Sequence, residues 1–214
     1  MKIQTYVLGM VSTNCYIIYN ENTKEAIVID PPDHAPAIAD KLKRKDLTPV
    51  AVLLTHGHFD HIMAAGDLAE SFHIPILAGE AEKELLADAN LNGSRMVRKN
   101  YELKGVEFVK DNELLTLGGM KIKVMYTPGH TAGGVCYYFE EEKILISGDT
   151  LFLESIGRTD LPTGNAGTLL ESIHGKLMIL PDEVAVYPGH GDRTTIGHER
   201  IHNPFLGKDN FWDI

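Results

Sequence analysis

The feature that most constrains the fold of this sequence is the run Thr-His-Gly-His-Phe-Asp-His at residues 55–61. Residues 50–54 precede it, and their apolar, partly β-branched side chains are typical of a buried strand. Residues 62–69 follow it, with their apolar side chains at helical spacing. We therefore expect a strand-to-helix loop in which Asp60 and His61 lie near the start of the helix.

Polar residues that can hold a metal ion recur at strand ends along the chain. His56 and His58 are two residues apart, so a strand-like backbone points both side chains the same way. Three more polar residues follow short apolar runs, each near a glycine. The full set of candidate ligands is His56, His58, Asp60, His61, His130, Asp149 and His190. Seven nitrogen and oxygen donors without a thiolate suit two borderline divalent cations better than one.

Composition bounds the class of protein. The chain has 214 residues, of which 43% are hydrophobic, so it can bury a sizeable core in one domain. Its formal net charge of −10 argues against a nucleic-acid partner, which normally requires a basic surface. No apolar run reaches membrane-spanning length and residues 1–6 lack the features of a secretory signal, so we expect a cytoplasmic protein with no membrane partner. Cys15 and Cys136 lie in strand-like runs and are expected to be buried thiols.

Hydrophobic periodicity and turn residues divide the chain into short elements. The expected strands are residues 3–8, 14–19, 26–30, 50–54, 75–78, 114–117, 120–126, 135–139, 144–147 and 184–187. The expected helices are residues 35–45, 62–72, 80–87 and 167–180, with a short helix or coil after His198. Residues 88–105 and 150–165 are expected to be loops, the first of them bordering the site. The pattern predicts an α/β fold of two sheets packed face to face, with helices outside and the ligands at one edge.

The order of the motifs resembles that of a known family. T-H-G-H-F-D-H, then a lone His130, then G-D-T at 148–150 and P-G-H at 188–190 resemble the metallo-β-lactamase superfamily. Residues 148–160, with G-D-T-L-F and I-G-R-T-D, look like its glyoxalase II-like branch, the hydroxyacylglutathione hydrolases. The resemblance implies an αββα sandwich, with residues 1–214 as a single domain. Only 24 residues follow His190, and Asp160 stands where the long enzymes carry an aromatic residue, so the short members without the extra C-terminal helical domain match better.

The resemblance also implies which donors share a metal. The first cation would be held by His56, His58 and His130, the second by Asp60, His61 and His190, and both by a bridging Asp149. Zinc is the usual metal of the family, and iron or manganese occupies some members.

Such a binuclear site is expected to hydrolyse a small-molecule thioester, either a hydroxyacylglutathione or an ester of a related low-molecular-weight thiol. A metal-bridging hydroxide would attack the carbonyl carbon. Asp149 would fix the separation of the metals, and Asp60 would bind a metal and orient the hydroxide. Arg158 is a candidate for binding a substrate carboxylate through its planar guanidinium, or else for pairing with Asp160.

Other functions stay open at this point. A persulfide dioxygenase would hold one iron through His56, His130 and Asp149 only. A metallohydrolase of another ester would keep all the donors, whereas a non-catalytic, metal-stabilised module would not need an open coordination position. β-Lactam hydrolysis is disfavoured because a bridging aspartate is not the usual ligand set of those enzymes. The motifs do not specify the thiol, the acyl group, the metal or the oligomeric state.

Overall fold

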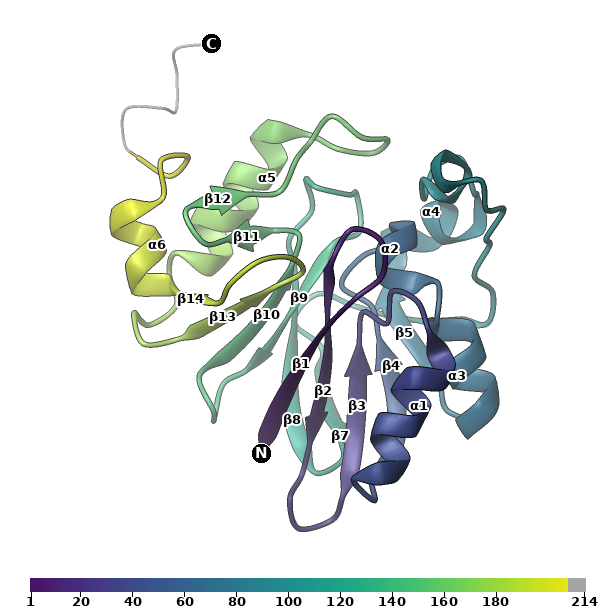
Figure 1. The fold of residues 1–214 in the computed structure, drawn as a ribbon. Helices are drawn as coiled ribbons and strands as arrows, with labels where there is room; N and C mark the ends of the chain where they lie inside the picture. The colour runs from purple at the N-terminus through teal and green to yellow at the C-terminus, as the bar shows by residue number, and fades with distance from the viewer. Residues whose placement is uncertain (208–214) are drawn as a thin grey trace.

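Two six-stranded sheets form the centre of the molecule, with helices on their outer faces (Figure 1). The structure is a computed structural model, and it describes residues 1–207. Helices α1 (Ala35–Arg44) and α3 (Ala65–Phe72) cover the first sheet, and α5 (Ala166–Ser172) and α6 (Ile196–His202) lie outside the second (Figure 1). The predicted αββα sandwich is therefore confirmed.

The first sheet is built from the N-terminal half of the chain, and its strands follow chain order. They are β1 (Lys2–Leu8), β2 (Thr13–Tyr19), β3 (Glu25–Ile29), β4 (Thr48–Leu53), β5 (Ile76–Gly79) and β6 (Val106–Val109). The first three strands pair antiparallel, while β3 to β6 pair parallel. Parallel neighbours need crossover connections, and α1 and α3 provide two of them. The ends of β3 and β4 therefore lie at the same edge of the sheet.

The second sheet comes from the C-terminal half and has the order β14-β13-β10-β9-β8-β7. Its strands are β7 (Leu114–Leu117), β8 (Met120–Tyr126), β9 (Val135–Phe139), β10 (Ile144–Gly148), β13 (Ala185–Pro188) and β14 (Thr194–Thr195). The neighbours β10 and β13 are parallel, and Gly148 pairs with Pro188 at their ends. The residues that follow these two strands, Asp149 and Gly189-His190, are thereby brought together.

Strand β2 shows how the sandwich is held together. Every residue of β2 is buried, because the strand is covered on both faces. Its alternate side chains divide between two layers of core. Cys15 and Ile17 pack toward α1 and α3, whereas Tyr16 and Ile18 pack between the sheets against residues such as Tyr137 and Phe139. Successive side chains of a strand point to opposite faces. Because both faces of β2 are covered, both sets of side chains are largely apolar and the strand reads as a nearly continuous apolar run.

The structure departs from the expected elements in a few places. The helix expected over 62–72 is two pieces, α2 (Phe59–Ile62) and α3, because the chain turns at Met63-Ala64. The helix expected over 80–87 starts as the 3-10 turn η1 (Glu80–Glu82) and continues as α4 (Lys83–Ala87). The helix expected over 167–180 is α5 followed by one π-helical turn, η3 (Ile173–Leu177).

Four short strands were not expected from the sequence. In β6 only Val109 is fully buried, since this four-residue strand lies at the edge of its sheet. The hairpin β11 (Leu151–Phe152) and β12 (Ser155–Ile156) lies within the expected 150–165 loop, and β14 has just two residues. Residues 88–105 are irregular as expected, apart from the 3-10 turn η2 (Ser94–Val97).

Two further expectations concern the whole chain. Cys15 and Cys136 are free and buried, as expected. Within residues 1–207, no helix combines the length and the apolar character needed to cross a bilayer.

Candidate metal centre

The candidate ligands lie on four segments at one edge of the sandwich. His56 and His58 follow β4, and Asp60 and His61 belong to α2, the turn of helix that comes next. His130 lies between β8 and β9, while Asp149 and His190 follow the paired ends of β10 and β13. The backbone N–H of Asn14 donates to the Gly189 carbonyl at 2.7 Å, which ties the His190 loop to the first sheet.

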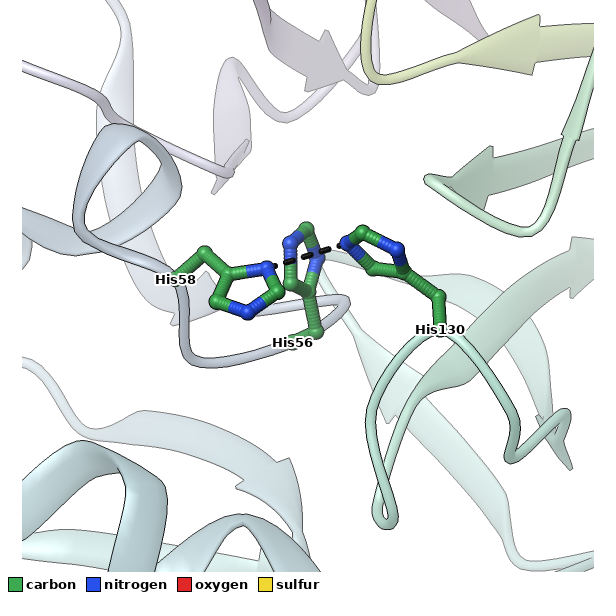
Figure 2. Close-up of side chains that lie close together, drawn as sticks. All are labelled: His56, His58 and His130. Carbon is green, nitrogen blue, oxygen red and sulfur yellow. Dashed lines mark hydrogen bonds between the residues drawn. The ribbon is translucent and has the colours of Figure 1, made fainter. Parts of the chain in front are cut away.

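The first group of donors is His56, His58 and His130. All three are buried, and their rings converge from the His56 loop and the opposite β8–β9 loop (Figure 2). Nδ1 of His58 lies 3.0 Å from Nε2 of His130. The ring of His56 packs edge-on to both, at centroid distances of 4.8 Å.

The second group is Asp60, His61 and His190. The Nε2 atom of His61 lies 3.4 Å from Oδ2 of Asp60, and the Nε2 atom of His190 lies 3.3 Å from the same oxygen. His61 is fully buried, whereas His190 is partly open to solvent at 28%. This group therefore forms the more accessible side of the centre.

Asp149 lies between the two groups. Its Oδ1 is 3.5 Å from Nε2 of His61, and its Oδ2 is 3.6 Å from Nε2 of both His130 and His190. One carboxylate thus reaches donors of both groups. All seven residues singled out in the sequence are brought together at one site.

The spacing of the donors fits divalent cations. Ligands about 2.1 Å from a tetrahedral zinc ion lie about 3.4 Å from one another. The nitrogen–oxygen distances within the site are 3.3–3.6 Å. In addition, His56 Nε2, His61 Nε2 and Asp149 Oδ1 are buried atoms without a hydrogen-bond partner. Buried polar atoms are normally satisfied, so these three point to a bound cation as the missing partner.

The electrostatics of the two groups differ. Burial lowers the pKa of His58 to about 3, and it also lowers the pKa values of His56 and His130. These imidazoles are neutral at pH 7 and present lone pairs, the form that binds a metal. Burial also opposes charge on His61, but Asp60, Asp149 and Asp30 outweigh it and hold the pKa of His61 well above its usual range. The pKa of His190 is raised by Asp60 and Asp149 against burial. Protons therefore compete with a cation more strongly on this side than in the first group.

Asp30, at the end of β3, orients two of the histidines. Its fully buried carboxylate accepts hydrogen bonds from the Thr55 amide at 2.7 Å and the Thr55 hydroxyl at 2.6 Å, and it lies 3.0 Å from Nδ1 of His61. The Thr55 oxygen is in turn 3.1 Å from Nδ1 of His56. Contacts of this kind fix the tautomer and the direction of a ligand ring. The sequence interpretation missed Asp30, although it follows an apolar strand just as the ligands do.

Glu82 joins the two loops that carry the first group. Its Oε2 accepts from the Gly57 amide and its Oε1 from the Gly133 amide, both at 2.7 Å. The side chain is fully buried, and burial raises its pKa although these bonds favour its ionised form. No signal in the sequence separates Glu82 from its neighbours Glu80 and Glu84.

The remaining contacts hold individual ligands. His130 Nδ1 donates to the Arg158 carbonyl oxygen at 2.7 Å, so Nε2 is the unprotonated nitrogen and faces the other donors. The hydroxyl of Thr13 donates to Asp60 Oδ2 at 3.3 Å. Among the threonines near these loops, Thr127 hydrogen-bonds to Cys136 and Thr150.

A cavity of about 740 Å³ opens over the metal centre. Its floor includes His58, His130 and His190. Its walls are formed by residues 90–93, 96 and 97, and by the β11–β12 hairpin together with residues 158, 161 and 162. This volume is in the range that holds a small organic ligand.

Arg158 lies in the second wall of this cavity. Its Nε and one terminal nitrogen donate to the two carboxylate oxygens of Asp160, at 2.7 and 2.8 Å. Both side chains are mostly exposed, and the pairing holds the pKa of Asp160 down at about 2. Of the two roles open to Arg158 from the sequence, the structure shows the pairing.

A model of one protein family matches residues 8–190, and its description is "Metallo-beta-lactamase superfamily". The chain belongs to the metallo-β-lactamase superfamily. The resemblance drawn from the motifs is therefore confirmed. Relatives include the probable metallo-hydrolase YqgX of Bacillus subtilis (strain 168), which is 40% identical over 214 residues, or 96% of this chain and 98% of that protein. The hydroxyacylglutathione hydrolase GloC of Haemophilus influenzae is 36% identical over 209 residues, with the same coverage of both chains.

Solved structures of the superfamily align over almost the whole chain. The BLEG-1 B3 metallo-beta-lactamase is 45% identical, with a TM-score of 0.91 covering 96% of this chain and 99% of that one. TTHA1623 in a di-iron-bound form is 32% identical, with a TM-score of 0.86 covering 95% and 100%. ETHE1 from Myxococcus xanthus is 29% identical, with a TM-score of 0.81 covering 99% and 88%. Membership of the superfamily makes this chain a metal-dependent hydrolase in the broad sense.

Proposed function

We propose that this protein is a binuclear metallohydrolase that cleaves a thioester of a low-molecular-weight thiol. The observation that carries the proposal is Asp149, whose two oxygens reach donors of both groups at 3.5 and 3.6 Å. A single cation would leave part of this donor set unused. The relative TTHA1623, solved in a di-iron-bound form, supports a two-metal centre. We propose zinc as the metal, with iron or manganese as alternatives.

Two divalent cations in such a site activate water at neutral pH and polarise the substrate carbonyl. The protein's own residues supply the geometry. Asp149 sets the separation of the two groups, and Asp60, held by the Thr13 hydroxyl, faces the open side with His190. Asp60 is thus suited to orient the attacking water. Asp30 and Thr55 hold His61 and His56 in their ligand orientation.

A thioester suits this arrangement because a thiolate is a good leaving group. Within the described residues, the cavity walls offer neither a lysine nor a cysteine that would serve as a strong general acid or nucleophile. The name of the GloC relative, a hydroxyacylglutathione hydrolase, supports the same bond type. The partner is therefore proposed to be a small-molecule thioester.

The test combines metal analysis with an assay panel. The purified protein should contain about two metal equivalents per chain, and chelation should abolish hydrolysis of lactoylglutathione or an equivalent uncharged thioester. Metal-loaded protein that cleaves no thioester contradicts the substrate assignment. Asp60→Ala should lose turnover while its far-ultraviolet circular dichroism stays unchanged, and retained turnover would contradict the proposed role of Asp60.

Two other reactions have specific support and belong in the same panel. The ETHE1 structural relative supports a mononuclear iron persulfide dioxygenase, and one iron per chain with oxygen uptake on a persulfide would favour it. The BLEG-1 relative supports β-lactam hydrolysis, and turnover of a β-lactam in preference to every thioester would favour that reaction. The full set of seven ligands argues for two metals and hence against the dioxygenase.

A further inference from the structure

The charges around the cavity suggest which thioesters it accepts. Outside the metal centre, Arg158 is the sole charged residue among the described residues that line the cavity. The other wall residues are apolar or uncharged, and they include Phe59, Leu91, Met96 and Phe152. Outside the metal centre, a substrate carboxylate would therefore have the Arg158 guanidinium as its one positively charged partner among the described wall residues. That guanidinium already pairs with Asp160.

Asp160 engages one edge of the Arg158 guanidinium, the edge formed by Nε and one terminal nitrogen, and places a negative charge against it. The pair is bidentate, and its members are two residues apart, so little chain entropy is lost in forming it. The Arg158 backbone is fixed as well, because its carbonyl accepts from His130. A substrate carboxylate would meet a guanidinium whose charge Asp160 already balances, and it would be repelled by Asp160. Asp160 thus masks the charge of the arginine from anionic ligands.

We propose that Asp160 is a specificity-determining residue, and that by masking Arg158 it directs the cavity toward thioesters whose arms carry no charge. The inference rests on the proposed thioester hydrolysis and deepens it. Glutathione has two carboxylates and an ammonium group, and the one charged residue of the described walls, Arg158, already has Asp160 as its counter-ion. An uncharged thiol and an apolar acyl chain instead match Met96 and the other apolar wall residues.

The first experiment compares two lactoyl thioesters on the metal-loaded protein. The esters are S-lactoyl-N-acetylcysteamine, which is uncharged, and S-lactoylglutathione, which is charged. The uncharged ester should have a kcat/KM higher by about three- to fivefold, the size expected for one exposed charge pair. A higher kcat/KM for the glutathione ester overturns this inference but leaves the proposed function standing. Hydrolysis of neither ester overturns the proposed function itself.

The second experiment releases the arginine. Asp160→Asn should raise the ratio of kcat/KM for the glutathione ester to that for the uncharged ester by about three- to fivefold, because the guanidinium becomes free to bind a carboxylate. The matched control is Glu183→Gln, which breaks the exposed Lys143–Glu183 pair at the far end of β10. An unchanged ratio in Asp160→Asn, with metal content equal to wild type, overturns the role of Asp160.

The third experiment probes the apolar wall. Lengthening the acyl chain of the uncharged ester from acetyl to butyryl should raise kcat/KM by up to about fourfold per methylene. Met96→Glu should flatten this dependence, because a charge would replace apolar contact at the cavity mouth. Ile179→Glu is the control, since Ile179 is 73% exposed and Met96 77%, and Ile179 lies outside the cavity. A chain-length dependence that is flat in wild type, or unaltered in Met96→Glu, overturns the assignment of this wall.

Discussion

The carboxylate of Asp30 lies 3.0 Å from Nδ1 of His61, and neither side chain is more than 1% exposed. Because a proton on Nδ1 is held by this carboxylate, Nε2 is the nitrogen that faces Asp60 and Asp149. Asp30 also holds Thr55, which contacts His56. One buried carboxylate therefore orients a histidine from each of the two donor groups.

Asp30→Asn should weaken metal binding. The amide would present hydrogens where Asp30 now accepts hydrogen bonds from Thr55 and from His61. Loss of such a contact typically costs about 10- to 100-fold in metal affinity or activity. Titration of the metal-free protein with zinc, followed by calorimetry, measures the effect. Asp40→Asn, on the exposed face of α1, is the control, and equal affinities in both variants would contradict the role of Asp30.

Glu82→Gln should destabilise the fold and loosen the first donor group. A glutamine keeps one acceptor oxygen, so one of the two amides of Gly57 and Gly133 would face a buried N–H₂ group instead. An unsatisfied buried donor costs about 1–3 kcal/mol, which a urea unfolding curve of the metal-free protein resolves. The exposed neighbour Glu84→Gln serves as the comparison. Identical unfolding midpoints in the two variants would show that the link between the loops is dispensable.

These two carboxylates mark the limit of what could be predicted from the sequence. The ligands were predictable because histidine and aspartate at glycine-bearing strand ends form a pattern, and parallel strands bring such ends together. Asp30 obeys the same rule, but before Pro31-Pro32 it was interpreted as the end of a strand and nothing more. Glu82 could not be found, because its burial depends on the approach of Gly133 from the other half of the chain. Similarly, β6 has only four residues and lies at an edge, so its short apolar pattern was too weak to identify it.

Gly189→Ala should disrupt the metal centre, although residue 189 is not one of the metal ligands. A Cβ at residue 189 would overlap Asp149 Oδ1 and lie 2.8 Å from His61 Cε1, so the donors would have to move apart. We expect activity to fall by about 10-fold or more, as for other changes that misplace ligands. Gly175→Ala is a suitable control because no atom lies within 4 Å of its added Cβ. The measurement is kcat/KM together with metal content, and wild-type values for both would contradict the close approach.

Acidification should release the metal from the second donor group before the first. The pKa values of His61 and His190 are raised, so protons compete with a cation there already as the pH falls toward about 6.5, the usual value for histidine. The pKa values of His56, His58 and His130 are lowered, that of His58 to about 3, so these nitrogens stay proton-free and keep their cation to a lower pH. Metal content after dialysis at stepwise lower pH should therefore fall from two equivalents to one and then to none.

His190→Ala should remove the first of these two steps and leave the second in place. Release of both equivalents in a single step in wild type would mean that the two groups do not differ in proton affinity.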